Sequence, residues 1–224
     1  MSFDFTRISM NNGNKYQYYS MSLSKKIYFS PLGYIISFFQ HLMSPFAKRM
    51  MVYGYRNPIT GKFNRATRIS SSAYIIEKDK LDIGDNVWIN HNARIDASGG
   101  LKIGDGCQIG YGSMILSHSS HMAVRLNGEA FIKLDIPERV GYIHKPVEIG
   151  EYTFIGGGAA VMPGVKIGKG CVIGVNSVVT KDIPDYAIVV GAPARIIGST
   201  IETDRKYFDN PTVRKYYYDK TLIK

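Results

Sequence analysis

The chain has 224 residues, of which 45% are apolar, and it carries a formal net charge of +10 at pH 7. This length suits one main domain with attachments, and the apolar content is ample for a core. No run of about 18 uncharged apolar residues occurs, so the sequence predicts no membrane-spanning helix. The start of the chain also lacks the charged-then-apolar order of a secretory signal. These features favour a cytoplasmic protein.

The positive charge is concentrated at the two ends of the chain. Residues 1–80 hold 12 Lys and Arg against 3 Asp and Glu, whereas residues 81–194 hold 9 against 11. No nucleic-acid-binding motif accompanies this charge, so we do not expect a nucleic-acid partner. An anionic membrane surface or a phosphorylated glycan fits the basic ends equally well.

Residues 1–66 are expected to form an N-terminal arm and a helical segment. Residues 25–51 place aromatic and aliphatic side chains between two basic pairs, a pattern that predicts one or two short helices. Such a helix could pack on the neighbouring domain, or it could lie on a membrane surface and hold the protein at the inner face of the cytoplasmic membrane. Residues 54–65 are rich in turn formers and are interpreted as a connector.

From residue 81 onward the sequence repeats every six residues, and an aliphatic residue occupies the third place of each repeat. A six-residue period gives an α-helix no single apolar face. Stacked coils can use it, because each hexapeptide forms one short flat side that points its aliphatic residue inward. The sequence therefore predicts an all-β solenoid over residues 67–198, entered through Ile69 and Ile75. Its inward positions are Ile83, Ile89, Ile95, Ile103, Ile109, Ile115, Ile149, Ile155, Val161, Ile167, Ile173 and Val179.

One long stretch, residues 117–146, interrupts the repeat. It holds three of the five histidines, and insertions of this size in a rigid repeat body usually carry binding or catalysis. Beyond the last repeat, residues 199–224 are basic and rich in tyrosine. We expect this tail to form a helix or an extended segment against a neighbouring subunit.

The two cysteines, Cys107 and Cys171, occupy the same place in their hexapeptides. A small inward residue fits there, so free buried thiols are expected, consistent with a reducing compartment. A catalytic thiol would need exposure and a cationic neighbour.

Two histidines, His118 and His121, stand where the chain leaves the repeat at Ile115. An imidazole held at the root of a loop by a stiff coil suits a general base. Taken alone, a loop histidine is more often an ordinary polar residue.

Four segments carry a resemblance to a known family. The chain resembles the hexapeptide-repeat acyltransferases with a left-handed parallel β-helix, in the branch of the galactoside, maltose and nodulation-factor acetyltransferases and of many O-antigen and capsule O-acetyltransferases. The matching segments are HSSHMAVRLNGEAF, the run from KPVEIGEY to VVTKDIP, the closing GAPARII and NVWINHNARI. The resemblance covers roughly residues 67–198.

The resemblance implies a homotrimer with sites between neighbours and direct transfer of acetyl from acetyl-CoA to a hydroxyl. It also implies that one histidine removes the proton of that hydroxyl. Matching the loops without a gap through Arg125 favours His118 as this base. Counting outward from Ile115 favours His121, which we place first.

The family's cofactor contacts map onto Gly157, Val175, Thr180, Lys181 and Arg195. Glycines at 156–158 would let a pantetheine arm approach the backbone closely, and the two cations could meet CoA phosphates. The alternative is that the glycines only turn corners and the cations are solvated.

The resemblance places Trp88, Asn90 and Arg125 on the acceptor side of the site. The aromatic face of Trp88 suits a sugar ring, although the residue could equally cap a corner. Two departures from the family concern the site: Phe154 stands where close relatives often have Trp, and the His-Pro pair of the catalytic loop is absent.

We therefore expect an acetyl-CoA-dependent O-acetyltransferase that modifies a saccharide of the bacterial surface, such as an O-antigen or a capsule, without a metal. Acetylation of a free sugar or an antibiotic is the first alternative. A lyase of the γ-carbonic anhydrase type, with zinc on His118, His121 and His144, is a second. A non-catalytic trimeric scaffold is a third.

Overall fold

The computed structural model describes residues 8–11, 15–18, 30, 32, 35 and 51–223. The chain divides into two compact units. One consists of Met1–Ala47 and Ser120–Tyr142, and the other consists of Lys48–Ser119 and Ile143–Lys224. In the first unit, β1 (Ile8–Asn11) pairs antiparallel with β2 (Lys15–Tyr18). Most of the expected helical segment at 25–51 lies outside the described residues. No helix in the described part of the chain has the length and apolar character needed to cross a bilayer.

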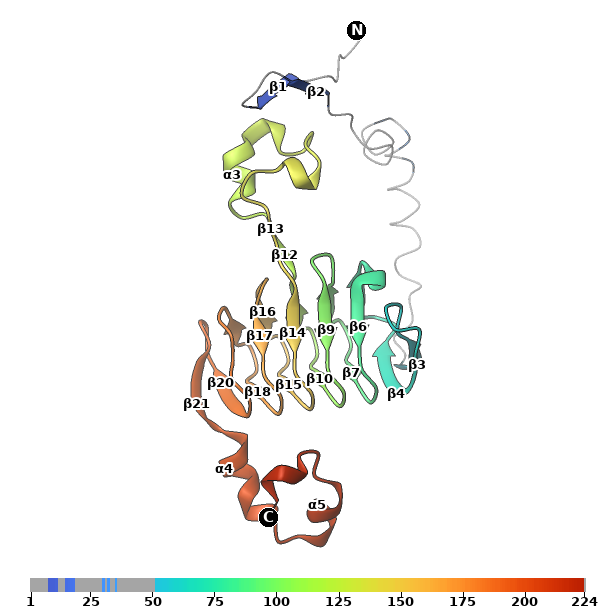
Figure 1. The fold of residues 1–224 in the computed structure, drawn as a ribbon, viewed down its shortest axis with the longest axis vertical. Coiled ribbons are helices and arrows are strands. Elements are labelled where there is room, and N and C mark those ends of the chain that lie inside the picture. Colours follow the sequence, from blue (N-terminus) through green and yellow to red (C-terminus); the bar gives the residue numbers. More distant parts are fainter. Residues whose placement is uncertain are drawn as a thin grey trace. The chain divides into compact units, whose positions relative to one another are not determined.

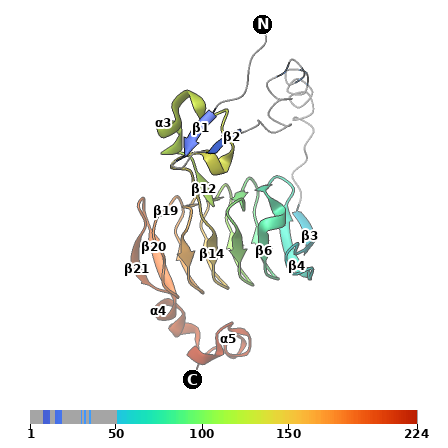
Figure 2. The same ribbon diagram turned by 45° about the horizontal axis from the view of Figure 1, so that its top comes forward.

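The second unit is a stack of coils whose strands pair in parallel from one coil to the next (Figures 1 and 2). We call its three sheets I, II and III. Sheet I runs in spatial order through β3 (Met51–Arg56), β4 (Phe63–Ser70), β7 (Trp88–Ile89), β10 (Gln108–Ile109), β15 (Phe154–Ile155), β18 (Val172–Ile173), β20 (Ala187–Val190) and β21 (Arg195–Ser199). Sheet II consists of β5 (Tyr74–Ile76), β8 (Arg94–Asp96), β11 (Met114–Ile115), β16 (Ala160–Val161) and β19 (Val178–Val179). Sheet III consists of β6 (Leu81–Ile83), β9 (Leu101–Ile103), β14 (Val147–Ile149) and β17 (Lys166–Ile167).

The inward aliphatic residues form the core. In sheet I, Ile89 pairs with Ile109, which pairs with Ile155, and each of the three side chains is 0% exposed. The corresponding residues of sheets II and III pair and are buried in the same way. The predicted all-β solenoid of stacked parallel coils is confirmed. Full burial of an aliphatic side chain contributes about 1.5–3 kcal/mol, so this column is the main source of stability.

Several corners between the sheets are occupied by asparagine. Asn86, Asn92 and Asn176 adopt positive φ angles of 55°, 58° and 56°. Asparagine tolerates this left-handed conformation better than most residues, because its short polar side chain can bond locally. The final Asn of repeats such as LDIGDN is thereby explained by backbone geometry.

Both ends of the β-helix are closed by antiparallel strands. At one end β3 and β4 form a hairpin. Its turn lies within residues 54–65, which the sequence indicated as a connector. Asn57 in that turn donates from Nδ2 to Asp82 Oδ1 at 2.7 Å and to the Ile83 carbonyl at 2.9 Å. The short 3₁₀ helix η2 (Lys78–Lys80) links β5 to β6. At the other end β21 turns back on β20 and covers the edge of sheet I.

The chain leaves the β-helix between β11 and β14. The exit and return form a two-stranded ladder of β12 (His118–Ser119) and β13 (Ile143–His144), with His118 opposite His144. Residues 120–142 contain α3 (Ala123–Asn127), η3 (Gly128–Ala130) and η4 (Ile136–Glu138). Asn127 ties this segment together, because its Nδ2 donates to the Ala123 and Val140 carbonyls at 2.6 and 2.9 Å.

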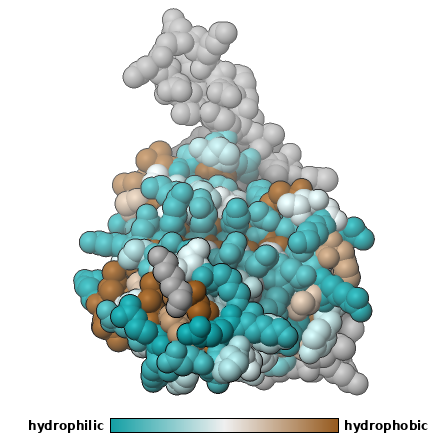
Figure 3. Space-filling model, turned by 60° about the horizontal axis from the view of Figure 1, so that its bottom comes forward, coloured by the Kyte–Doolittle hydropathy of each residue, from teal (hydrophilic) through white to brown (hydrophobic). Residues whose placement is uncertain are grey.

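The C-terminal tail packs on the coils of its own chain. It contains α4 (Thr200–Asp204), η5 (Arg205–Tyr207), α5 (Pro211–Tyr216) and η6 (Lys220–Leu222), and it leaves the lower side of the coils in Figure 1. Buried Asp219 accepts hydrogen bonds from Lys169 Nζ at 2.7 Å and from the Tyr186 hydroxyl. Figure 3 shows mostly hydrophilic side chains on this side, with smaller hydrophobic patches.

Both cysteines are free and buried, as predicted. Burial raises the pKa of the Cys107 thiol to about 12. The Cys107 thiol donates to the Gly150 carbonyl at 3.0 Å, so it serves as a small inward residue of its corner.

Truncation of one inward residue tests the core. Ile109→Ala removes a side chain with no exposed surface, and we expect it to lower the free energy of unfolding by about 2–5 kcal/mol. The outward neighbour Gln108 supplies the control, since Gln108→Ala should change it by less than about 0.5 kcal/mol. Urea denaturation followed by circular dichroism measures both, and equal losses would contradict the assignment of an inward core.

The contacts of Asp219 predict how the tail responds to pH. Hydrogen bonding from Lys169 first, and then from Thr221 and Tyr186, lowers the Asp219 pKa, and Asp219 in turn raises the pKa of Lys169. The lowered carboxyl pKa stabilises the docked tail above about pH 4, and the raised amine pKa does so below about pH 10. The tail should therefore loosen as the pH falls through the folded pKa of Asp219 or rises through that of Lys169.

Asp219→Asn should release the tail at neutral pH, increasing amide hydrogen exchange over residues 200–223 while leaving the coils protected. Asp209→Asn is the matched control, because the Asp209 side chain is fully exposed where it pairs with Arg214. Similar exchange in the two variants would show that Asp219 does not hold the tail.

Candidate active site

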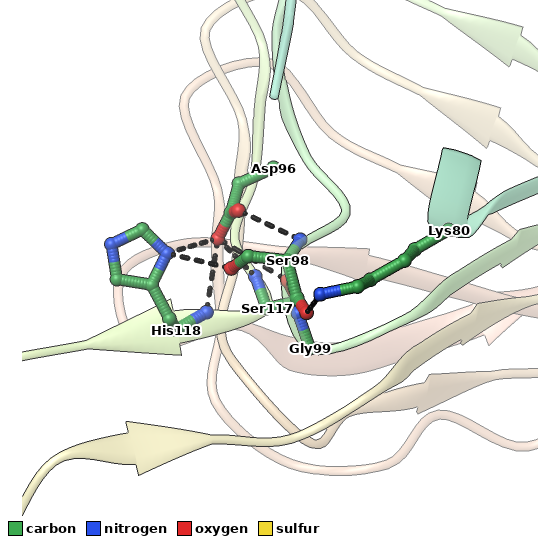
Figure 4. Close-up of polar contacts among 6 residues, drawn as sticks. All are labelled: Lys80, Asp96, Ser98, Gly99, Ser117 and His118. Atoms are coloured by element: carbon green, nitrogen blue, oxygen red, sulfur yellow. Dashed lines mark hydrogen bonds and ion pairs between the residues drawn. The ribbon is translucent and has the colours of Figure 1, made fainter. Parts of the chain in front are cut away.

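The exit strand β12 places His118 against a buried carboxylate. His118 Nδ1 lies 2.5 Å from Asp96 Oδ2 and 3.1 Å from Ser98 Oγ (Figure 4). Asp96 ends β8, one coil before His118, and is 2% exposed, whereas the His118 side chain is 34% exposed. The imidazole therefore contacts a buried carboxylate and is itself partly exposed to solvent.

Asp96 also receives the backbone donors that the departing chain leaves unpaired. The N–H groups of Ser117 and His118 both donate to Asp96 Oδ2 at 3.0 Å, and the Ser98 N–H donates to Oδ1 at 3.0 Å. The Ser117 hydroxyl adds a bond of 3.2 Å to Oδ2. Buried charges persist only with such partners.

These contacts determine the charge of Asp96. Burial raises the pKa of its carboxyl, but hydrogen bonds from Ser98, the charge of His118 and the Ser117 N–H together outweigh burial and lower it below its ordinary value. The carboxylate is then ionised at neutral pH and accepts a proton-bearing Nδ1. A neutral imidazole with its proton on Nδ1 carries its lone pair on Nε2. In Figure 4 the second ring nitrogen, Nε2, points away from Asp96.

A groove of about 730 Å³ borders this pair along sheet II. Outward side chains of β5, β8 and β11 form its floor, with Tyr74 opposite Arg94 and Arg94 opposite Met114. Its lining comprises Ser72, Tyr74, Ile76, Asn92, Arg94, Ile95, Asp96, Met114, Leu116 and His118. A ligand in the groove would contact the imidazole.

The other histidine considered as a base, His121, belongs to the unit that contains residues 120–142. Its carbonyl accepts a hydrogen bond of 2.6 Å from Arg125 Nη1, and both residues are exposed. Arg125, predicted on the acceptor side, thus orders the start of this segment.

The five predicted cofactor positions lie at two different corners. Gly157 and Val175 follow β15 and β18, at the corner between sheets I and II, where the Asn176 N–H donates to the Gly157 carbonyl at 3.0 Å. Arg195 begins β21 near this corner and is exposed. A Cβ at 157 would lie 3.3 Å from the Tyr111 carbonyl oxygen, which is a tight contact.

Thr180 and Lys181 lie at the corner between sheets II and III. They follow β19 and precede Ile183, which bridges to Ile167 of sheet III, and both are exposed. His118 leaves the coils at this same corner, between β11 and β14. Sheet II therefore separates Gly157 and Val175 from Thr180 and Lys181.

The two remaining acceptor candidates lie on sheet I and at its corner with sheet II. The guanidinium of Arg68 stacks over the Trp88 ring at 4.1 Å, so one face of the indole is already covered. Asn90 is 7% exposed and donates from Nδ2 to the Ile109 carbonyl at 3.1 Å. The atoms Trp88 Nε1 and Asn90 Oδ1 are buried without a hydrogen-bond partner. Phe154 lies in the same sheet and is 42% exposed.

Within the described part of the chain, no group of three or more His, Cys, Asp or Glu side chains could hold a metal ion. Asp96 was not among the site residues predicted from the sequence. A signal was present, because Asp96 follows the inward Ile95 at a place where the next coils carry Leu116 and Met162. An acidic residue in that column requires donors from the chain itself.

Residues 146–181 match the family described as bacterial transferase hexapeptide (six repeats). The chain is 30% identical over 142 residues to the galactoside O-acetyltransferase of Escherichia coli K12, covering 62% of this chain and 64% of that protein. It is 36% identical over 124 residues to a putative acetyltransferase of Saccharomyces cerevisiae, covering 54% and 57%. The hexapeptide repeats of residues 146–181 are thus those that this family model describes.

Among solved structures, a galactoside acetyltransferase in complex with coenzyme A aligns with a TM-score of 0.49 at 31% identity, covering 66% of this chain and 64% of that one. A hexapeptide-repeat acetyltransferase from Vibrio cholerae aligns with a TM-score of 0.48 at 29% identity, covering 57% and 66%. The chain spans less than two thirds of the length of the curated relatives it matches. The matched hexapeptide-repeat segment includes Gly157, Val175, Thr180 and Lys181 but not His118.

Replacement of the buried carboxylate tests the tautomer. In Asp96→Asn the Nδ1–H of His118 loses its anionic acceptor, so the neutral ring should populate both tautomers instead of one. Nitrogen-15 spectra of the histidine side chains at pH 8 distinguish the two forms. Asp82→Asn, a change to an outward carboxylate of sheet III, is the control. An unchanged His118 signal in Asp96→Asn would contradict the proposed role of the carboxylate.

The lowered Asp96 pKa also predicts a response to acid. Its contribution to stability is complete above about pH 4 and is lost as the pH falls through the folded pKa. Thermal melts from pH 7 to pH 2 should therefore show a loss of stability in the wild-type chain that is reduced in Asp96→Asn. Identical profiles would argue against an ionised, stabilising Asp96.

Proposed function

We propose that this protein is an acetyl-CoA-dependent O-acetyltransferase that modifies a hydroxyl group of a bacterial surface saccharide. The observation that carries the proposal is the contact between His118 and buried Asp96 at the border of a groove. Hexapeptide-repeat relatives named as acetyltransferases support the reaction class. The class of acceptor follows from the resemblance to O-antigen and capsule O-acetyltransferases.

In the proposed mechanism, the acceptor hydroxyl lies in the groove within hydrogen-bond distance of His118 Nε2. The imidazole takes the hydroxyl proton as the hydroxyl oxygen attacks the carbonyl carbon of the thioester. Asp96 stabilises the imidazolium that forms. The same imidazolium then returns the proton to the departing thiolate. Acetyl-CoA supplies the acetyl group as a thioester.

Several of the predicted cofactor residues could contact the CoA part of the donor. Lys181 and Arg195 are exposed cations that could contact its phosphates, and Gly157 has no side chain of its own to obstruct a pantetheine arm. Because sheet II separates Gly157 and Val175 from Thr180 and Lys181, one CoA on a single chain would have to cross that sheet. Contacts from two neighbouring chains would remove this requirement.

That geometry supports a further element of the proposal, a homotrimer with CoA between adjacent chains. Four side-chain atoms in the described part of the chain are buried without a hydrogen-bond partner, and two of them, Trp88 Nε1 and Asn90 Oδ1, lie in and next to sheet I, where a neighbour or ligand could supply a partner. Burial of a polar atom without a partner costs about 1–3 kcal/mol, which favours an additional group at this place.

Among the two histidines, we now assign the base to His118. The preference for His121 in the sequence rested on counting from Ile115, which does not register a carboxylate in the preceding coil. His121 and Arg125 then order the start of the loop through their own hydrogen bond. Residues 25–51 would hold the enzyme near a lipid-linked acceptor at the inner face of the membrane. Acetylation of a free sugar or an antibiotic remains the alternative acceptor class.

The test is release of CoA thiol from acetyl-CoA in the presence of surface glycans and free sugars. His118→Asn should lower kcat by about 10²–10⁴-fold, because it removes the proton acceptor and retains the side-chain size. His121→Asn is the matched variant and should keep at least a tenth of the wild-type rate. Full activity of the His118→Asn variant would rule out the proposed mechanism.

A further inference from the structure

The groove on sheet II contains one cation that the proposed chemistry does not use. Arg94 stands at the centre of the floor, with Tyr74 on one side and Met114 on the other, and it is exposed. No carboxylate in the described part of the chain forms an ion pair with it. Asp96, the groove's acidic residue, is instead committed to His118, Ser98 and Ser117.

We infer that the groove binds an acceptor bearing an anionic group and that Arg94 selects it. This inference rests on the proposed function and specifies its substrate class: a saccharide with a carboxylate or phosphate close to the hydroxyl that is acetylated. A guanidinium presents paired donors that match a carboxylate or a phosphate. The rest of the lining suits a sugar, because Tyr74 offers an aromatic face and Ser72 and Asn92 offer short polar groups.

The spacing along β8 supports this assignment. Arg94 and Asp96 are two residues apart on one short strand, so their Cα atoms are separated by about 6.5 Å. Asp96 holds the imidazole, so the backbone of Arg94 lies about the length of one sugar ring from the residue that positions the proposed base. An anionic group on the same sugar, or on the adjoining one, falls within reach.

The two sources of the anionic group can be separated with small acceptors. Methyl β-glucuronide provides a carboxylate, glucose 1-phosphate provides a phosphate, and methyl β-glucoside is the neutral counterpart. The wild-type protein should bind one of the two anionic compounds at least about tenfold more tightly than the glucoside, which is the typical gain from a charge-assisted bond. Calorimetry without acetyl-CoA measures this binding directly, so it does not depend on turnover.

Arg94→Gln should remove the preference and Arg94→Lys should restore part of it, since lysine keeps the charge but not the paired donors. Arg65→Gln, a change to an exposed arginine of β4 outside the groove, is the control and should keep the preference. The KM for acetyl-CoA should stay within about twofold in Arg94→Gln, because an arginine that bound CoA phosphates would raise it instead. Thermal melting identifies any variant that fails to fold.

The outcomes separate this inference from the proposed function. Equal wild-type affinity for anionic and neutral sugars, or a preference that survives in Arg94→Gln, overturns the inference even if acetyl transfer is observed. A rise in the KM for acetyl-CoA reassigns Arg94 to the donor and also overturns it. Selective binding of the anionic sugar without any thiol release would uphold the groove and reject the proposed reaction.

Discussion

The structure depends on one repeated contact: an inward aliphatic residue that stacks on its counterpart one coil away, fixed by parallel backbone hydrogen bonds. The chain advances about 20 residues per coil, so residues that distant in sequence become neighbours on adjacent strands. Asp96 and Ser117 are 21 positions apart and directly bonded. Because each strand is only two or three residues long in most coils, side chains just beyond a strand are placed almost as firmly as those within it.

The candidate active site follows from the way in which the chain leaves that lattice. Where residues 117–146 depart, the chain passes from the parallel sheets into the antiparallel pair of β12 and β13, and the N–H groups of Ser117 and His118 need partners at this turn. A carboxylate in the preceding coil accepts both of them, and the same oxygen then meets His118 Nδ1. A structural requirement for backbone partners therefore brings an ionised carboxylate to an imidazole. The Lys145 N–H donates to the Ser117 carbonyl at 2.9 Å where the chain returns, which closes the ladder on the other side.

Much of this architecture was accessible from the sequence, because a six-residue period leaves few alternatives. The inward isoleucines, the free cysteines and the entry through Ile69 and Ile75 followed from that period, and Ile69 and Ile75 indeed pair with Ile89 and Ile95. The hairpin of β3 and β4 was missed, since its turn residues indicate a turn but not the partner strands. The contact between Asp96 and His118 was also missed, because a position count gives backbone spacing but not side-chain hydrogen bonds.

The outward faces of the three sheets differ in how many charged side chains they carry. Along sheet III the outward residues alternate in charge, in the order Asp82, Lys102, Glu148 and Lys166, and Lys166 pairs with Glu148 at 3.1 Å while both stay exposed. Covering such a ladder would desolvate every charge for little gain, so water is its most favourable neighbour. Sheet II instead presents Met114, Ala160 and Val178 beyond Arg94, and sheet I presents Trp88, Phe154 and Val172. Sheets I and II thus have fewer charged groups on their outward faces than sheet III, and both adjoin the corner that carries Gly157 and Val175.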